Sequence, residues 1–210
     1  DLDAARAVRQ FKASSFTFLF APAYNPAVAH VQPVRKALGI PTIFNTLGPL
    51  LSPGRPSLQI MGIAHPAQGQ LIAQVFRELG RERALVVHGA GTDEIATHGT
   101  TQVWELNDGE IVSYELTPED LGIKRHELAD LAGGDGAANA QALRAVFAGR
   151  GEPAHCDAIA ASAGAMFYLN GTTETIAAGV THAKELIGSG AVEEWLSLHE
   201  STNYAVGEEN

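Results

Sequence analysis

The most constraining feature of the sequence is a run of two apolar segments separated by a helical one, with short links between them. Residues 57–64 (SLQIMGIA) and 83–89 (RALVVHG) are rich in aliphatic residues at strand length. Between them, residues 66–80 (PAQGQLIAQVFRELG) have helical apolar spacing and end at Gly80, a typical C-terminal cap. Strand, helix and strand in this order form a right-handed parallel unit. The sequence therefore predicts an α/β fold with a mostly parallel sheet flanked by helices.

Shorter patterns predict the remaining elements. Residues 101–116 alternate apolar and polar side chains around an Asp-Gly turn, which indicates an antiparallel hairpin. Capping residues and apolar spacing predict helices at the start of the chain, over 117–122, over 133–149 with Asp135 as the cap, and in three further segments up to residue 200. The aromatic run at 15–21 has the length and composition of a strand.

No linker, repeat or low-complexity segment divides the 210 residues, so we predict a single α/β domain over 1–210. Residues 201–210 show no helical or strand period and are expected to form a frayed tail. The chain starts without Met and within the pattern of an amphipathic helix. We therefore expect it to be a fragment of a longer protein.

The charge balance bears on the partners of the protein. The chain carries 14 Lys and Arg against 24 Asp and Glu, and its net charge of -10 would repel a phosphate backbone. We therefore expect no nucleic-acid partner. No apolar run reaches the roughly 20 residues that span a bilayer, and the acidic start is unlike a signal peptide. The single cysteine, Cys156, is predicted to be a buried, inert thiol. Together these features predict a cytoplasmic protein without membrane contact.

Two adjacent carboxylates follow the second apolar segment. In GAGTDEIA (89–96), Asp93 and Glu94 come after a glycine-rich turn at the carboxyl end of a predicted strand, where open α/β sheets bind ligands. Neighbouring acids suit Mg²⁺, which takes oxygen ligands from one or two carboxylates, waters and phosphates. A solvated loop, or a helix cap by Asp93, explains the same pair. The spacing alone does not choose between these interpretations.

Other segments offer weaker candidates. Gly133 and Gly134 present backbone N–H groups at a helix start, which suits an anion site or an ordinary helix cap. None of the eight His has metal-ligand spacing, which argues against zinc, and the chain lacks the G-x-S-x-G and P-loop motifs. His88, at a strand end, either packs against the sheet or faces the site.

The segment from Pro22 to Arg35 is a candidate for one side of a pocket. Pro22, Asn25 and Arg35 are spaced so that a loop and the helix it starts face the same space, with Asn25 as the N-cap. The two-pronged guanidinium of Arg35 suits a carboxylate ligand. Its place near a helix end equally suits a surface arginine that complements the helix dipole.

Three blocks of the sequence together resemble one known family. The first, FLFAPAYNPAVAHVQPVRKALGIPTIFNTLGPLLSPGRP from Phe18, contains A-P-x-x-x-P, P-V-R-x-x-L-G and F-N-x-L-G-P-L elements. ALVVHGAGTDEIA and LAGGDGAANAQALRAVFAG follow in order. The combination resembles the anthranilate phosphoribosyltransferases, enzymes of tryptophan biosynthesis that join anthranilate to phosphoribosyl pyrophosphate. The resemblance runs over nearly the whole chain.

The resemblance implies a fold, a reaction and a set of site residues. The family joins a small helical domain to a larger α/β domain of the nucleoside phosphorylase type, as a homodimer that uses Mg²⁺. By this likeness Asp93 and Glu94 hold Mg²⁺ against the pyrophosphate. Arg35 meets the anthranilate carboxylate, and Pro22 and Asn25 line the same pocket. The anthranilate amine attacks the ribose as pyrophosphate departs, so the resemblance implies no covalent catalytic side chain.

Two departures from the family pattern bear on these expectations. The family usually has His where this chain has Asn25, and Asn does not carry a proton at neutral pH. The G-T-G-G-D and K-H-G-N segments, which precede the matched part in the family, are not found here. By this resemblance we expect the chain to be the large domain alone, the C-terminal catalytic part of a longer protein. We expect it to be incomplete for activity and unable to bind phosphoribosyl pyrophosphate properly by itself.

Three alternatives remain open at this point. A pyrimidine nucleoside phosphorylase resembles the same fold and transfers a ribosyl group to phosphate, but its signatures are absent. A non-catalytic relative that binds nucleic acid should carry a basic groove, which the net charge of -10 disfavours. An interaction or structural domain is the third alternative.

Overall fold

The computed structural model describes residues 3–25, 37, 39 and 43–205. Contacts between Cα atoms group the chain into two compact units. The first unit comprises Asp1–Pro56 and Leu198–Asn210, and the second comprises Ser57–Ser197. Each unit is described by itself. The prediction of one domain over 1–210 stays a prediction, because grouping by contacts does not show whether a unit folds independently.

The first unit is helical in its described part. Helix α1 (Ala4–Ser14) begins at Asp3, whose carboxylate accepts a hydrogen bond from the Arg6 N–H at 2.8 Å. The short helix α2 (Ala21–Tyr24) and α4 (Ile43–Leu50) follow. The predicted helix at the start of the chain is therefore present.

The prediction of a strand over 15–21 is wrong, because residues 16–20 adopt no regular structure. Phe16 and Phe18, which belong to this aromatic run, are 52% and 66% exposed. A strand needs a second strand to satisfy its backbone N–H and C=O groups. The strands that pair in the described part of the chain all lie in the second unit.

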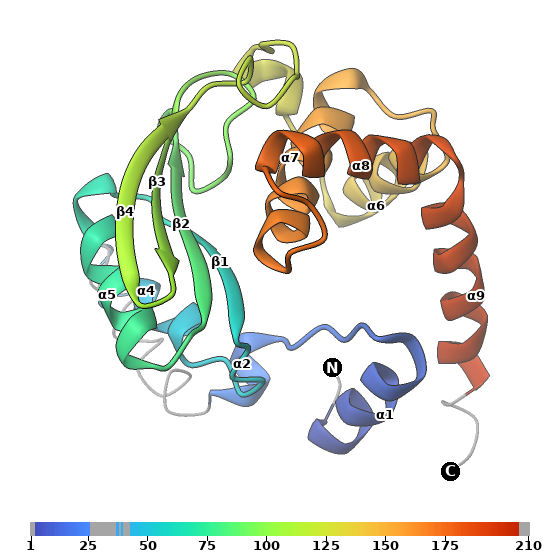
Figure 1. Ribbon diagram of the computed structural model, residues 1–210. Helices are drawn as coiled ribbons and strands as arrows, with labels where there is room; N and C mark the ends of the chain where they lie inside the picture. The colour runs from blue at the N-terminus through green and yellow to red at the C-terminus, as the bar shows by residue number, and fades with distance from the viewer. Residues whose placement is uncertain (1–2, 26–36, 38, 40–42, 206–210) are drawn as a thin grey trace. The chain divides into compact units, whose positions relative to one another are not determined.

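The second unit is built on a four-stranded sheet in the order β1-β2-β3-β4. Its strands are β1 (Leu58–Gly62), β2 (Arg83–Gly89), β3 (Thr101–Asn107) and β4 (Glu110–Leu116) (Figure 1). β1 runs parallel to β2, with Ile60 opposite Leu85, and β3 and β4 form the predicted antiparallel hairpin.

The predicted α/β class with flanking helices is confirmed, but the described sheet is mixed rather than mostly parallel. Of its three strand pairs, β1·β2 is parallel, whereas β2·β3 and β3·β4 are antiparallel. The reason lies in the connection between β2 and β3. Residues 90–100 contain no helix that would carry the chain back across the sheet, so β3 returns beside β2 in the opposite direction.

Helices cover both faces of this sheet (Figure 1). Helix α5 (Gly69–Glu78), preceded by the 3-10 turn η1 (Pro66–Gln68), packs on one face through Ile72, Ala73 and Phe76. Helices α7 (Pro153–Leu169) and α8 (Ile176–Gly188) lie on the other. Leu85 and Val87 of β2 join the core beneath α7 and α8. The alternate residues of β2 point the other way, so this strand is buried on both faces, as its apolar run predicts.

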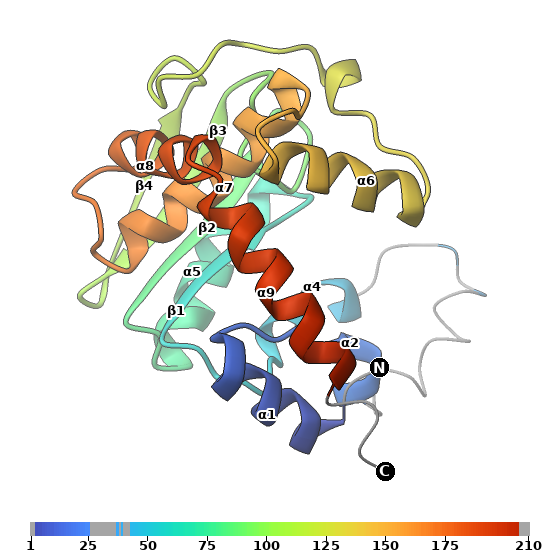
Figure 2. The same ribbon diagram turned by 90° about the vertical axis from the view of Figure 1, so that its right-hand side faces the viewer.

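The remaining helices follow the hairpin. The 3-10 turn η2 (Leu128–Leu131) leads into α6 (Gly136–Phe147), which lies beside α7 (Figure 2). Asp135 caps α6 as predicted, accepting a hydrogen bond from the Ala138 N–H at 2.9 Å. Helix α9 (Ala191–Ala205) extends past residue 201, where the predicted tail begins, and residues 206–210 lie outside the described part.

The short helix predicted over 117–122 is a single turn. Its start signals are correct, since Thr117 Oγ1 donates to Asp120 Oδ2 at 2.7 Å and accepts from the Asp120 N–H at 3.2 Å. Gly122 then adopts a left-handed conformation with φ of 69°. This ends the turn before a second one forms.

Helices α7 and α8 cross with their backbones in contact at two glycines. A side chain at Gly164 would meet the Val180 backbone N at 2.5 Å, and one at Gly179 would overlap the carbonyl of Gly164. The absence of a Cβ at both positions lets the helices approach closely. The close contact at this crossing packs α7 against α8 over one face of the sheet.

A buried carboxylate connects the hairpin to α7. Glu105, which is 5% exposed, accepts hydrogen bonds from the hydroxyls of Tyr114 at 2.8 Å and Tyr168 at 2.7 Å. Arg83 Nη2 lies 3.7 Å from the same carboxylate, and its guanidinium stacks over the Tyr168 ring. Burial, together with the neighbouring Glu105, raises the pKa of Tyr114. Its hydroxyl therefore stays protonated and keeps donating.

We expect Glu105→Ala to lower the free energy of unfolding by about 3 kcal/mol, because it leaves a largely buried Arg83 charge and two hydroxyls without their acceptor. Urea unfolding followed by Trp fluorescence measures the change. Glu115→Ala, an exposed position on the same hairpin, is the matched control and should change stability by less than about 0.5 kcal/mol. Equal losses in the two variants would contradict the role of Glu105.

Candidate functional site

A tight turn at the end of β2 presents the two predicted acids. Ala90 and Gly91 both have positive φ, 45° and 90°, which is typical of a type I′ turn. Gly89 and Thr92 close this turn with backbone hydrogen bonds of 3.0 and 2.9 Å. The segment that follows, residues 92–98, is called the acid loop because it carries Asp93 and Glu94.

The acid loop lies directly against the ends of two strands. A side chain at Gly62, the last residue of β1, would overlap the Asp93 carbonyl. A side chain at Gly89, the last residue of β2, would overlap the Glu94 carbonyl and meet the Ala96 backbone N at 2.6 Å. Glycine at both strand ends therefore seats the loop on the carboxyl edge of the parallel pair. This is the edge at which the sequence places the two acids.

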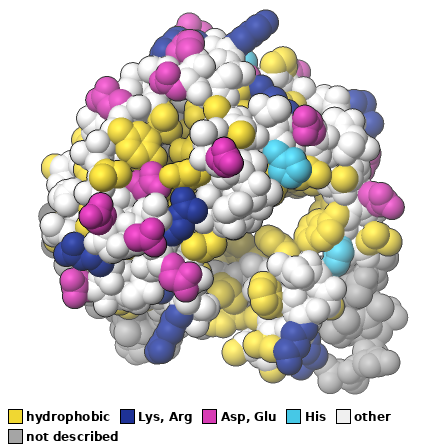
Figure 3. Space-filling model, in the orientation of Figure 1, with side chains coloured by type: hydrophobic (Ala, Val, Ile, Leu, Met, Phe, Trp, Pro, Cys, Tyr) yellow, Lys and Arg dark blue, Asp and Glu magenta, His cyan; other side chains and the backbone are white. Residues whose placement is uncertain are grey.

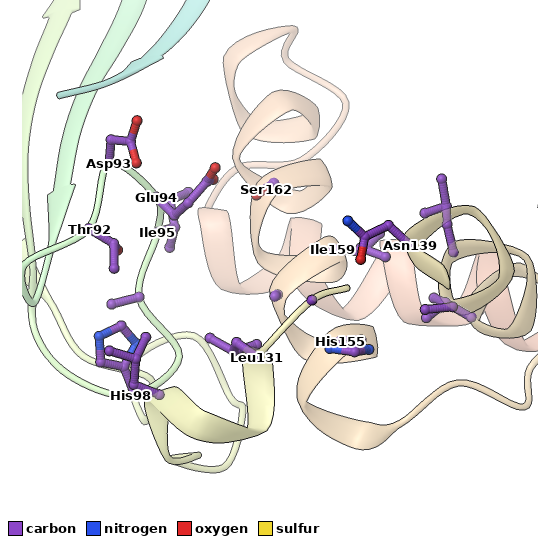
Figure 4. Close-up of a pocket in the computed structure, with 17 residues that line it drawn as sticks. Thr92, Asp93, Glu94, Ile95, His98, Leu131, Asn139, His155, Ile159 and Ser162 are labelled. Atoms are coloured by element: carbon purple, nitrogen blue, oxygen red, sulfur yellow. The ribbon is translucent and has the colours of Figure 1, made fainter. Parts of the chain in front are cut away.

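A cavity of about 530 Å³ separates the acid loop from the helices. Its walls come from the acid loop, from η2 with Gly133, from α6 and from α7 (Figure 4). The polar side chains that line it are Thr92, Asp93, Glu94, His98, Asn139, His155 and Ser162. Glu94 extends from the acid loop toward α7, where Ser162 lies (Figure 4). The larger apolar side chains are Ile95, Leu128, Leu131, Leu143, Val146 and Ile159.

The neighbouring Asp93 affects the pKa of Glu94. Partial burial raises the pKa of Glu94, and repulsion from the neighbouring Asp93 raises it further. Because this pKa is higher in the folded protein than in the unfolded chain, ionised Glu94 costs stability above it, and the cost disappears as the pH falls through it. The site thus concentrates negative charge at some expense in stability.

We expect Glu94→Gln to raise the free energy of unfolding at pH 7, by less than about 1 kcal/mol because water screens an exposed side chain. The gain should shrink as the pH is lowered to 4.5, the ordinary pKa of a glutamate. Urea unfolding at several pH values measures it. Glu82→Gln, at an exposed position outside the cavity, serves as the control and should show no such trend. A variant less stable than wild type at pH 7 would contradict the repulsion.

The glycine pair before α6 forms a helix cap. Gly134 N–H donates to Asn139 Oδ1 at 2.8 Å, and Asn139 Nδ2 donates back to the Gly134 carbonyl at 3.1 Å. With the Asp135 cap also formed, these bonds support the capping interpretation over an anion site at the helix start. Asn139 and Gly133 both line the cavity.

Of the remaining predicted site residues, Pro22 and Asn25 belong to the first unit. Pro22 lies in α2, and Asn25 ends that helix, with its backbone N–H and its Nδ2 donating to the Ala21 carbonyl at 3.0 and 3.1 Å. The helix that Asn25 was expected to start, and Arg35 within it, lie outside the described residues. His88 Nδ1 is 2.9 Å from the Ile63 carbonyl, so this histidine packs at the sheet edge.

Sequence reasoning missed three polar residues on the helix side of the cavity, Asn139, His155 and Ser162. Asn139 had a usable signal, since asparagine is a poor residue inside a helix unless its side chain has a local partner. Ser162 stands in an otherwise apolar stretch of α7. His155 carries no comparable signal.

The donor set fits magnesium better than zinc. Among the described residues, no three His, Cys, Asp or Glu side chains are grouped to hold a metal ion. A structural or catalytic zinc needs three or four such ligands. Mg²⁺ is commonly held by one or two carboxylates, with waters and substrate phosphates completing its shell. Asp93 and Glu94 meet that requirement beside an open cavity.

Three sequence-based expectations concern the surface and the thiol. On the face in Figure 3, the described Lys and Arg side chains lie scattered among acidic ones rather than in a basic cluster. None of the described helices has the length and apolar composition needed to cross a membrane. Cys156 is partly buried, and burial raises the pKa of its thiol, which disfavours the reactive thiolate.

Curated relatives match nearly all of the chain. An anthranilate phosphoribosyltransferase of Corynebacterium aurimucosum is 77% identical over 204 residues, 97% of this chain and 59% of the relative. One of Corynebacterium diphtheriae is 65% identical over 98% of this chain and 60% of its own length. The chain thus spans about three fifths of the length of these curated relatives.

Solved structures agree with the fold. The crystal structure of an anthranilate phosphoribosyltransferase from Thermus thermophilus matches with a TM-score of 0.85 and 37% identity, over 92% of this chain and 57% of that one. The Saccharomyces cerevisiae enzyme in complex with PRPP and Mg matches with a TM-score of 0.85 and 29% identity, over 94% and 57%. Residues 1–193 match the model of the glycosyl transferase family, a/b domain. The chain therefore belongs to the glycosyl transferase family, a/b domain.

Proposed function

We propose that the protein transfers a phosphoribosyl group from phosphoribosyl pyrophosphate to anthranilate and releases pyrophosphate, as a step of tryptophan biosynthesis. The observation that carries the proposal is the acid pair Asp93 and Glu94 on the wall of a cavity at the strand ends. A relative that bears the name of this activity is 77% identical over 97% of the chain.

Asp93 and Glu94 would hold Mg²⁺ through their carboxylate oxygens. The raised pKa of Glu94 supports this role, because a cation relieves the repulsion between the two acids. The Saccharomyces cerevisiae relative was solved with PRPP and Mg. When bound, Mg²⁺ would stabilise the negative charge that develops on the departing pyrophosphate.

Pro22, Asn25 and Arg35 are proposed to form the anthranilate site. The guanidinium of Arg35 has the geometry to bind the carboxylate of anthranilate with two parallel hydrogen bonds. The amide of Asn25 supplies a hydrogen-bonding group where the family usually has His. The Saccharomyces cerevisiae relative has also been solved with 4-fluoroanthranilate.

The reaction needs positioning more than covalent chemistry. The anthranilate amine forms a bond to C1 of the ribose as the bond from C1 to the pyrophosphate oxygen breaks, and the amine then loses a proton. Holding the two substrates in line lowers the entropic part of the barrier. We further propose that the whole protein acts as a cytoplasmic homodimer.

The direct test is an assay of the full-length protein, as its gene encodes it, with anthranilate, phosphoribosyl pyrophosphate and Mg²⁺. We expect loss of anthranilate fluorescence in step with pyrophosphate release, and no loss when Mg²⁺ is chelated. Cleavage of pyrimidine nucleosides by phosphate, without consumption of anthranilate, would instead identify a nucleoside phosphorylase.

A further inference from the structure

A histidine outside the predicted site joins three walls of the cavity. The His126 backbone N–H donates to the Thr97 carbonyl at 2.9 Å, and Thr97 belongs to the acid loop. The His126 side chain lies 2.7 Å, from Nε2 to Oδ2, from Asp157 on α7. In the chain, His126 leads into η2, which supplies Leu128 and Leu131 to the cavity.

Asp157 is a fixed anchor for this contact. It is 9% exposed and lies on α7 between His155 and Ala158, both of which line the cavity. Lys184 Nζ on α8 lies 2.7 Å from Asp157 Oδ1. The carboxylate is therefore held between an ammonium group and the imidazole. An ionised carboxylate only accepts hydrogen bonds, so His126 donates through Nε2–H.

Two other hydrogen bonds of the acid loop run toward the sheet and not toward α7. Ala96 N–H donates to Thr101 Oγ1 at 2.9 Å, and His98 Nε2 lies 3.2 Å from the Ala90 carbonyl. The first bond joins the loop to β3, and the second joins it to the turn after β2. His126 ties it in the other direction, to α7 across the cavity. Arg125 adds a longer contact, with Nη1 at 3.4 Å from the His98 carbonyl.

We propose that His126 is a positioning residue, which together with Asp157 fixes the acid loop relative to α7 and so sets how tightly Asp93 and Glu94 bind a divalent cation. The metal part rests on the proposed function. The positioning part rests on the hydrogen bonds alone. A charge-assisted hydrogen bond at 2.7 Å is among the stronger contacts that a loop can make. Its loss should loosen the loop while the buried sheet stays intact.

Hydrogen exchange measured by mass spectrometry tests the positioning. In the full-length protein we expect His126→Leu to speed amide exchange roughly tenfold in residues 92–98 and 127–133, since it removes a hydrogen bond to a charged group. Exchange in β2 and α8 should not change. His126→Gln is the matched control, because its amide can donate to Asp157 from nearly the same place, and it should restore slow exchange. If His126→Leu fails to fold, His126→Asn, whose amide is too short to reach Asp157, replaces it.

Binding of Mn²⁺, followed by its electron paramagnetic resonance signal, tests the effect on the metal. We expect His126→Leu to weaken Mn²⁺ binding roughly tenfold, consistent with the loss of one charged hydrogen bond, and His126→Gln to keep it. Asp93→Asn is the reference variant for the metal site. If Asp93→Asn does not weaken Mn²⁺ binding, the proposed function is contradicted, whereas the positioning role of His126 is not. Unchanged exchange in residues 92–98 in the Leu variant, or equally fast exchange in the Gln variant, would overturn the role of His126.

Discussion

Gly179→Ala is expected to lower the free energy of unfolding by roughly 2 to 3 kcal/mol. The added methyl group would overlap the Gly164 carbonyl, which belongs to the rigid backbone of α7. Neither helix can yield locally, so the pair must move apart and loosen its packing on the sheet. Urea unfolding followed by Trp fluorescence measures the loss. Gly164→Ala should behave in the same way, since its methyl group would meet the Val180 backbone N.

Gly188→Ala is the matched control for this crossing. It lies in the same helix as Gly179, but among the described residues no atom beyond the nearby backbone of that helix lies within 4 Å of the added methyl group. Alanine is the better helix former, so this variant should be as stable as wild type or gain up to about 1 kcal/mol. A loss at Gly188 as large as the loss at Gly179 would contradict the backbone contact as the cause.

Asp93→Asn and Glu94→Gln are each expected to lower the turnover of the full-length protein roughly 100-fold, because each removes one charge of a carboxylate pair proposed to hold Mg²⁺. The concentration of Mg²⁺ needed for half-maximal rate should rise in both variants. Steady-state assays of anthranilate consumption at several Mg²⁺ concentrations measure both quantities. Glu78→Gln, at a side chain that is 79% exposed on α5, should leave them unchanged.

The two site variants also separate a functional loss from a folding loss. Glu94→Gln is expected to be at least as stable as wild type at pH 7, since it removes repulsion with Asp93. Lost turnover together with retained stability would mark a residue kept for its chemistry. Unchanged kinetics in both variants would remove Asp93 and Glu94 from the site.

Local signals in the sequence predict much of the second unit. The parallel pair β1 and β2 with α5 between them, the hairpin at 101–116 and the Asp135 cap each depend on residues close together in the chain. The sequence goes wrong where the outcome depends on distant partners. Residues 15–21 have strand composition but find no strand to pair with among the described residues. The mostly parallel sheet fails because a loop, not a helix, joins β2 to β3.

The candidate site shows the same division. The position of Asp93 and Glu94 at a strand end follows from the local pattern of turn and strand, and the structure places them there. Asn139, His155 and Ser162 reach the cavity only because α6 and α7 fold back toward the acid loop. The spacing of residues in the sequence does not predict that α6 and α7 pack near the acid loop. Three predicted residues, Pro22, Asn25 and Arg35, belong to the first unit, and their roles stay predictions.

The two glycines at the ends of β1 and β2 limit how this site can be redesigned. The backbones of Gly62 and Gly89 contact the acid loop directly, so neither strand end has room for a larger residue. On the helix side, His155 and Ser162 line the cavity with their side chains, whereas Asn139 also bonds to the Gly134 backbone before α6. A library aimed at a new acceptor or a new metal should therefore vary the helix side and leave the strand ends untouched.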